Sequence, residues 1–115
     1  MHKLKVAIAG FGIVGRRRFL YIKEHPSLEV TAICEQHPLD KNIEYSAINY
    51  YNNYKELLEK ENLDIIFVCL TNNIAAEVTI NSLKKGLHVF CEKPPGMTVQ
   101  EIKQVIKVEK SFPKL

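Results

Sequence analysis

The chain has 115 residues, of which 46% are apolar and 25% charged, and its formal charge is +3. This length suffices for one hydrophobic core and excludes a large two-domain enzyme, since domains usually run to about 100–150 residues. The charge is too mild to point to nucleic acid, and no apolar run approaches the roughly 20 residues that span a membrane. Residues 1–5 lead into an apolar segment without a signal-peptide pattern. We therefore expect one cytoplasmic domain over residues 1–115, without a nucleic-acid or membrane partner.

The cysteine content indicates neither disulfides nor a metal site. The chain has three cysteines, Cys34, Cys69 and Cys91, an odd number at spacings of 35 and 22 residues. These spacings match neither a disulfide framework nor a zinc site. The expected role of the three side chains is that of small buried apolar groups, and no metal ligand is predicted.

Taken in chain order, the sequence alternates two kinds of segment. Short continuous apolar runs, typical of strands covered on both faces, lie at residues 6–9, 28–34, 65–70 and 87–91. Segments with helical patterns lie at residues 13–24, 54–60 and 75–85, and a last helix is expected from the capping box at Thr98 to before Pro113. Asn52 or Asn53 is the expected N-cap of the second helix, and Gly86 is the expected stop of the third.

This alternation predicts the fold. Strands joined by helices require right-handed crossovers and a parallel sheet. The tyrosine- and asparagine-rich stretch 36–53 is expected to hold a variable helix or loop and a short third strand. Stacking of these tyrosines on single-stranded nucleic acid is a minor alternative. We predict an α/β fold with a doubly wound Rossmann sheet and helices on both faces.

A glycine-rich motif lies between the first expected strand and the first expected helix. Residues 10–15 read Gly10, Phe11, Gly12, Ile13, Val14, Gly15, which is G-x-G-x-x-G. Gly10 permits a tight turn, Gly12 lets the backbone approach a pyrophosphate, and Gly15 lets the helix pack closely on the strand. The N-terminus of the helix offers free N–H groups and a positive dipole end to the phosphates. In this position the motif predicts a dinucleotide site.

An acidic residue at the expected distance supports the dinucleotide and favours NAD. Glu35 follows Gly15 by 20 positions, at the carboxyl end of the second expected strand. A carboxylate there accepts hydrogen bonds from the adenosine ribose and repels a 2′-phosphate. The arginines at 16–18 favour NADP in principle, but their expected role is a solvated helix face. The residues that follow Glu35 are Gln36 and His37, with no arginine there to meet a 2′-phosphate.

A third motif, Glu92-Lys93-Pro94, follows the last expected strand. Ligands of open α/β sheets bind beyond the carboxyl ends of the strands, so Lys93 is expected near the reactive end of a bound dinucleotide. A lysine there can donate to a substrate hydroxyl or carbonyl, and desolvation can lower its pKa enough for proton transfer. A lysine before proline is also common in surface turns, so the pattern by itself leaves both interpretations open.

Taken together, these segments resemble the N-terminal domain of the glucose-fructose oxidoreductase / inositol dehydrogenase / MocA (Gfo/Idh/MocA) family, over essentially all 115 residues. The most specific element is GLHVFCEKP at 86–94. The resemblance implies that the three motif glycines hold the cofactor pyrophosphate and Glu35 the adenosine ribose. It places Glu92, Lys93 and Pro94 at the nicotinamide end, with Lys93 as the catalytic candidate.

The sequence departs from the family in the loop after the fourth strand. Members commonly carry a Thr-Pro-Asn-x-x-His-like stretch, where this chain has Leu70, Thr71 and Asn72, then Asn73, Ile74 and Ala75. Asn72 matches, while Thr71 replaces the proline and Ala75 the histidine. By resemblance, Leu70, Thr71 and Asn72 belong to the cofactor site near the nicotinamide, and no role is expected for the missing histidine.

The resemblance also implies an activity. Full-length members transfer a hydride between a nicotinamide cofactor and a hydroxyl-bearing carbon of a sugar, cyclitol or nucleotide-sugar, with a second, substrate-binding domain. We expect this chain to be the cofactor half, which binds NAD without turnover alone. The alternative is a stand-alone nucleotide-sensing or interaction module. A homo-oligomer is also expected, because the strand at 87–91 would form an unpaired sheet edge. We expect the residues that choose the substrate to lie in that second domain.

Overall fold

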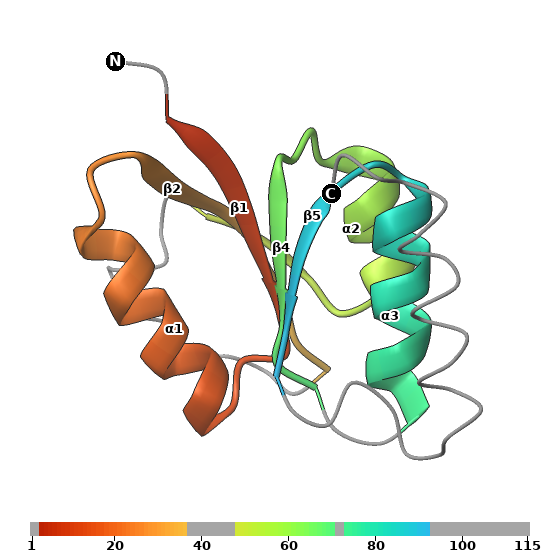
Figure 1. Ribbon diagram of the computed structural model, residues 1–115. Helices are drawn as coiled ribbons and strands as arrows, with labels where there is room; N and C mark the ends of the chain where they lie inside the picture. Colours follow the sequence, from red (N-terminus) through yellow and green to blue (C-terminus); the bar gives the residue numbers. More distant parts are fainter. Residues whose placement is uncertain (1–2, 37–47, 71–72, 93–115) are drawn as a thin grey trace.

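The computed structural model describes residues 3–36, 48–70 and 73–92. These residues form a five-stranded sheet with strand order β3-β2-β1-β4-β5, in which every neighbouring pair is parallel (Figure 1). The elements run in the order β1 (Leu4–Ala9), α1 (Ile13–Glu24), β2 (Leu28–Cys34), β3 (Asn49–Tyr51), α2 (Tyr54–Lys60), β4 (Ile65–Val68), α3 (Asn73–Lys84) and β5 (His88–Cys91). The predicted α/β, doubly wound sheet is confirmed.

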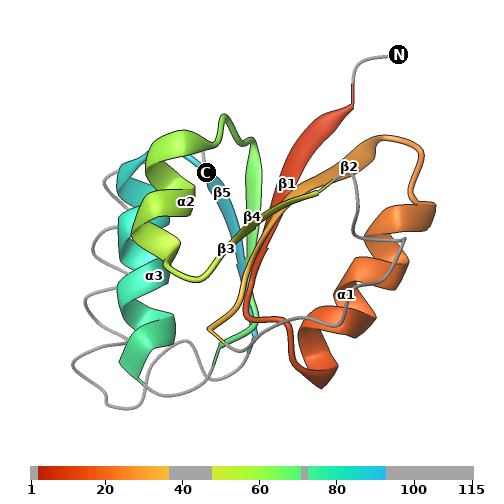
Figure 2. The ribbon, with the colours of Figure 1, turned by 180° about the vertical axis from the view of Figure 1, so that it is seen from behind.

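Helices cover both faces of the sheet. Figures 1 and 2 show α1 on one face and α2 with α3 on the other. The side chains of β1 alternate between the two faces, as those of a strand must. Val6 and Ile8 pack on the α1 side with Phe19, while Ala7 packs on the other side with Leu57 of α2. Because β1 is buried on both faces, its sequence is a continuous apolar run rather than an alternating one.

The predicted elements agree closely with the observed ones. The bounds of α1, β2 and α2 are as predicted, and the side chain of Asn53 caps α2 by accepting from the Lys55 N–H at 2.8 Å. β4 is two residues shorter than expected, and α3 begins two residues earlier. Gly86 adopts a φ of +89° just after α3, which fits its predicted role as a helix stop. The helix predicted from Thr98 lies outside the described residues.

The register of the sheet brings the carboxyl ends of its strands into one row. Ala9 pairs with both Cys34 and Val68, Cys34 pairs with Tyr51, and Val68 pairs with Cys91. The residues that directly follow β1, β2, β4 and β5 are therefore neighbours at one edge of the sheet; they are Gly10, Glu35, Cys69 and Glu92. This carboxyl edge is where ligands of open α/β sheets bind.

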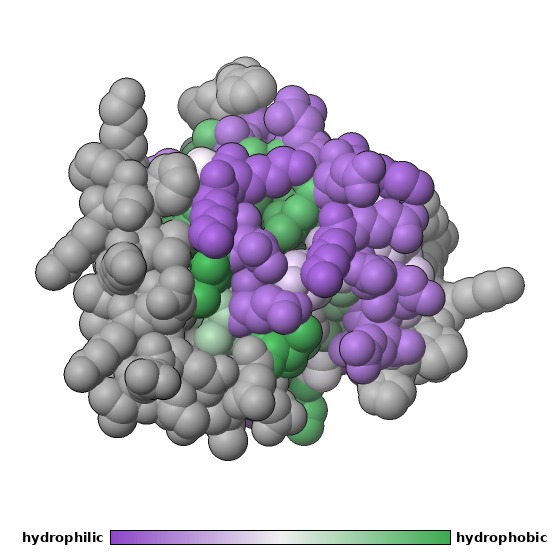
Figure 3. Space-filling view, turned by 90° about the vertical axis from the view of Figure 1, so that its right-hand side faces the viewer, coloured by the Kyte–Doolittle hydropathy of each residue, from purple (hydrophilic) through white to green (hydrophobic). Residues whose placement is uncertain are grey.

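The outer face of α2 and α3 is mostly hydrophilic over its described residues (Figure 3). Glu56 and Lys60 form an i,i+4 ion pair at 3.0 Å on the surface of α2. Within the described ranges, every helix is too short or too polar to span a bilayer.

Candidate functional site

Backbone hydrogen bonds extend the strand ladders by one residue at the carboxyl edge. The N–H of Gly10 donates to the Cys34 carbonyl at 2.8 Å, and the N–H of Cys69 donates to the Ala9 carbonyl at 2.8 Å. The two acidic residues form the same kind of bond. The N–H of Glu35 donates to the Tyr51 carbonyl at 2.9 Å, and the N–H of Glu92 donates to the Val68 carbonyl at 3.0 Å. The glycine motif and both carboxylates are thus fixed to the same edge.

Two glycines of the motif are required by the backbone itself. Gly10 has a φ of +94°, and a Cβ built there would lie 2.5 Å from the carbonyl oxygen of Cys69 and 2.8 Å from Leu70 Cδ2. A Cβ on Gly15 would lie only 2.0 Å from the carbonyl oxygen of Gly10. Gly10 therefore permits the turn and its close contact with the end of β4, while Gly15 lets α1 pack on that turn. Both roles are those predicted from the motif.

Gly12 differs, because it faces open space. A Cβ built on Gly12 would meet no atom within 4 Å, so the fold itself does not require a glycine there. Gly12 is also the N-cap of α1, and its cap forms no side-chain hydrogen bond. The first residues of the helix, Ile13 and Val14, are 74% and 41% exposed. The start of α1 therefore has open space beside Gly12 and the free N–H groups and positive dipole end that suit a phosphate group.

Glu35 is joined directly to the glycine motif. Its Oε1 accepts a hydrogen bond from the Phe11 N–H at 2.8 Å, so the carboxylate lies against the loop between Gly10 and Gly12. The hydroxyl of Tyr50 in β3 donates to the Glu35 carbonyl oxygen at 2.5 Å. The sequence placed Glu35 near the loop but gave no indication of Tyr50, which holds the Glu35 backbone from the neighbouring strand.

Phe11 and Leu70 enter the site in different ways. The Phe11 ring is 2% exposed and packs edge-on against Phe19, with ring centroids 5.8 Å apart. Phe11 therefore offers its backbone to the site while its side chain belongs to the core. Leu70, two residues after β4, lies close enough to Gly10 that a Cβ there would contact it, while its predicted place in the cofactor site stays a prediction.

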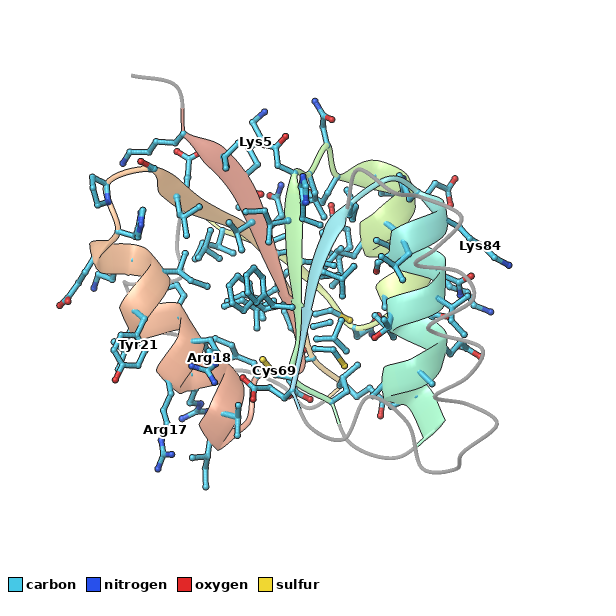
Figure 4. The ribbon with its side chains drawn as sticks, viewed as in Figure 1. Lys5, Arg17, Arg18, Tyr21, Cys69 and Lys84 are labelled. Atoms are coloured by element: carbon cyan, nitrogen blue, oxygen red, sulfur yellow. The ribbon has the colours of Figure 1, made fainter. Side chains whose placement is uncertain are left out.

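Glu92 forms an ion pair with Arg18, a residue that the sequence assigned to a solvated helix face. Glu92 Oε1 accepts from Arg18 Nε at 2.5 Å. The hydrogen bond and the negative charge of Glu92 raise the pKa of the Arg18 guanidinium above its usual range. Figure 4 shows Arg18 beside Cys69 on the sheet side of α1, while Arg17 points away from the sheet. Arg18 therefore has a specific partner in addition to its place on the helix surface, where its side chain remains 42% exposed.

The position of Arg18 in the helix agrees with this contact. Residues three apart lie on the same side of a helix, so Arg18 shares the buried side of α1 with Gly15. Arg16 is also engaged, since its Nε donates to the Phe11 carbonyl at 3.4 Å and its guanidinium lies 5.8 Å from the Phe11 ring centroid.

The remaining site residues predicted from the sequence lie outside the described residues. These are Thr71, Asn72, Lys93 and Pro94. Ala75, which stands where the family has a histidine, is fully buried in α3. Among the described residues, no group of three or more His, Cys, Asp or Glu side chains is arranged to hold a metal ion.

The three cysteines have free thiols, and Cys34 is buried while the other two are half-buried. Burial, with a smaller contribution from the charge of Glu35, raises the pKa of the Cys34 thiol from 9.0 to about 11. Burial and the charge of Glu92 raise the pKa of the Cys69 thiol to about 12, against the opposing effect of Arg18. Burial also raises the pKa of Cys91. Thiols of this kind are poor nucleophiles at neutral pH.

We expect the cysteines of the folded chain to react slowly with iodoacetamide at neutral pH. A rise from 9.0 to about 11 lowers the thiolate fraction of Cys34 about a hundredfold, and the effect on Cys69 is larger. Alkylation should accelerate as pH rises toward these values, because only the thiolate reacts. Mass spectrometry of the folded chain and of the chain in urea measures the rate at each cysteine. Equal rates for Cys69 in the two states would contradict the prediction.

Comparison with known proteins places this arrangement in a family. Residues 4–114 match the family model described as "Oxidoreductase family, NAD-binding Rossmann fold", GFO_IDH_MocA. An inositol 2-dehydrogenase of Salmonella paratyphi B is 30% identical over 114 residues, which cover 92% of this chain and 33% of the relative. An α-N-acetylgalactosaminidase of Shewanella oneidensis is also 30% identical, over 119 residues that cover 90% of this chain and 26% of the relative.

Solved structures agree with the sequence relatives. The myo-inositol 2-dehydrogenase of Lactobacillus plantarum superposes with a TM-score of 0.84 at 34% identity, covering 96% of this chain and 34% of that protein. The chain thus spans about a third of the length of the relatives it matches. The chain belongs to the Gfo/Idh/MocA oxidoreductase family, and residues 4–114 correspond to its NAD-binding Rossmann domain.

Proposed function

We propose that this chain binds NAD in preference to NADP at the carboxyl edge of the sheet. The observation that carries the proposal is the hydrogen bond from the Phe11 N–H to Glu35 Oε1 at 2.8 Å. It fixes a carboxylate beside the glycine loop, where the adenosine ribose of a Rossmann-bound dinucleotide lies. A carboxylate accepts several hydrogen bonds at once, so its bond to Phe11 is compatible with bonds from ribose hydroxyls. A 2′-phosphate at the same place would meet negative charge.

The glycine loop has the features that a pyrophosphate requires. Gly12 borders open space, and the N-terminus of α1 directs N–H groups and a positive dipole end toward it. Gly10 and Gly15 keep the turn and the helix close to the strand. These residues hold the phosphates through the backbone and need no lysine or arginine for the purpose.

We assign the chemistry of the whole protein to hydride transfer at a hydroxyl-bearing carbon of a polyol or sugar. The inositol 2-dehydrogenase is named for such a reaction on a polyol, and the α-N-acetylgalactosaminidase is named for a sugar substrate, which supports the compound class alone. When bound, the nicotinamide ring supplies or accepts the hydride. The Nζ of Lys93 takes up the proton of the substrate hydroxyl on oxidation and returns it on reduction. Four further residues complete the proposed nicotinamide side of the site: Leu70, Thr71, Asn72 and Pro94. Because the chain spans about a third of its relatives, we expect cofactor binding without turnover from this chain alone.

Location and assembly are further proposals. Three free cysteines fit a reducing compartment, which supports a cytoplasmic protein. β5 is the last strand in the described order, and such an edge favours pairing with a second copy, which supports a homo-oligomer.

The proposed cofactor preference is tested by titrating the chain with NADH and with NADPH, with the cofactor fluorescence as the signal. We expect saturable binding of NADH, and binding of NADPH weaker by about tenfold or more, since a carboxylate and a phosphate repel at close range. ADP-ribose should displace NADH from the same site. A linear, non-saturating signal up to about millimolar NADH would contradict the proposal, and so would a preference for NADPH.

A further inference from the structure

The ion pair between Arg18 and Glu92 connects the two sides of the candidate site. Arg18 lies in α1, the helix that begins at the glycine loop, and Glu92 directly follows β5. Their side chains meet with Nε and Oε1 2.5 Å apart although the residues are 74 positions apart in sequence. The pair therefore spans from the segment proposed to hold the pyrophosphate to the segment that leads into Lys93.

The two ends of this pair are anchored in different parts of the core. α1 is held by Phe19 and Ile22, which pack in the cluster that covers one face of the sheet. Val89 and Cys91 of β5 pack against the cluster on the other face. The backbone of Glu92 is held by Val68 of β4. The side chain of Glu92 thus links β5 to a helix that packs on the opposite face of the sheet.

The exposure of the pair limits what it does for stability. The Arg18 side chain is 42% exposed and that of Glu92 is 31% exposed, and ion pairs of this exposure contribute little to the free energy of unfolding. The contact does, however, join the Glu92 side chain to α1 at one defined point, Arg18 Nε to Glu92 Oε1. We therefore expect the pair to affect the local geometry of the site. A displacement of a reacting group by about 1 Å lowers the reaction rate strongly.

The ion pair also argues against a role for Arg18 in binding a cofactor phosphate. The negative charge of Glu92, 2.5 Å from Arg18 Nε, offsets the positive charge of the guanidinium, so Arg18 is a weaker candidate than an unpaired arginine for binding a cofactor phosphate. The neighbouring Arg17 is exposed and points away from the sheet (Figure 4). Two adjacent arginines of one helix therefore differ in direction and in the contact with Glu92, which makes Arg17 a control for the loss of a positive charge alone.

We propose that Arg18 is a positioning residue: through Glu92 it holds the carboxyl end of β5 in place beside the nicotinamide half of the bound dinucleotide. This rests on the proposed function, because the position matters only if a dinucleotide occupies the carboxyl edge. α1 then acts as one rigid body that carries the phosphate-binding loop at its start and the contact to Glu92 about 7.5 Å further along its axis. The adenosine half of the cofactor is held by Glu35 and the glycine loop and does not depend on Arg18.

The test compares Arg18→Gln with the matched control Arg17→Gln, using NADH and ADP-ribose as probes. ADP-ribose contains the adenosine, pyrophosphate and second ribose but lacks the nicotinamide ring. We expect Arg18→Gln to weaken NADH binding about fivefold and to change the emission of the bound nicotinamide, with ADP-ribose affinity unchanged. Arg17→Gln should match wild type in all three measurements. Arg18→Lys, and the charge-exchanged double variant Arg18→Glu with Glu92→Arg, should restore part of the loss.

The outcomes separate this inference from the proposed function. If wild type binds both probes and Arg18→Gln binds NADH with wild-type affinity and emission, Arg18 has no positioning role. Equal weakening of NADH and ADP-ribose also overturns that role, because it indicates damage to the whole site. Thermal unfolding of Arg18→Gln should stay within about 3 °C of wild type, so misfolding does not explain a selective loss. If wild type binds neither probe, the proposed function fails as well.

Discussion

Gly15→Ala is expected to destabilise the chain severely. The new Cβ would lie 2.0 Å from the carbonyl oxygen of Gly10 and 3.0 Å from its carbonyl carbon. Both are backbone atoms, so no rotamer change relieves the overlap and α1 must move away from β1. Such overpacking lowers the free energy of unfolding by about 3 kcal/mol or more. The gain of about 1 kcal/mol from replacing glycine by alanine in a helix does not offset it.

The measurement is thermal unfolding by circular dichroism, with Gly12→Ala as the matched control. The midpoint of Gly15→Ala should fall by roughly 10 °C or more. Gly12 has a φ of −80°, which alanine adopts, and its Cβ meets nothing within 4 Å. Gly12→Ala should therefore unfold near the wild-type temperature, but bind NADH at least about tenfold more weakly, because its methyl group enters the space proposed for the pyrophosphate. A Gly15→Ala chain as stable as wild type would refute the packing argument.

The strands and helices were predictable because their signals are local. A strand buried on both faces gives a continuous apolar run, as in β1 and β4, and this signal does not depend on distant residues. The cap at Asn53 and the stop at Gly86 are local in the same sense. The differences from the prediction lie at the ends of the elements. β4, for example, stops at Val68 although the apolar run continues, because the length of a strand depends on its pairing with β1 and β5 rather than on its composition.

Positions of the candidate site were predictable where the fold type itself requires a particular kind of residue. Gly10, Gly15 and Glu35 lie where the motif and its spacing predict. The contacts of Arg18 and Tyr50 were not predictable, because each depends on the register of neighbouring strands. Arg18 meets Glu92 only because β5 ends in the same row as β1, and 74 positions separate the pair. No spacing rule within a single segment contains that information.

Glu35→Gln is expected to reduce the preference for NAD over NADP by at least about tenfold. Glutamine keeps an oxygen that can accept from the Phe11 N–H, which Glu35 Oε1 now engages at 2.8 Å, so the loop should stay in place. What it loses is the negative charge that a 2′-phosphate would face. At close range in partly screened surroundings, one such charge contributes about 1–4 kcal/mol, which is ample for a tenfold change. NADPH binding should therefore strengthen, with NADH binding weakened only a few-fold through the poorer ribose contact.

Glu35→Ala distinguishes the charge from the hydrogen bond. Alanine removes both, leaving the Phe11 N–H without its carboxylate partner, so the loop loses a contact as well as a charge. We expect Glu35→Ala to bind both cofactors more weakly than Glu35→Gln does, while the NADH to NADPH ratio stays close to that of Glu35→Gln. Fluorescence titrations of the three proteins with both cofactors provide the six affinities. If the ratio is the same in wild type and Glu35→Gln, Glu35 does not face the 2′ position, and the assignment of NAD as the preferred cofactor loses its basis.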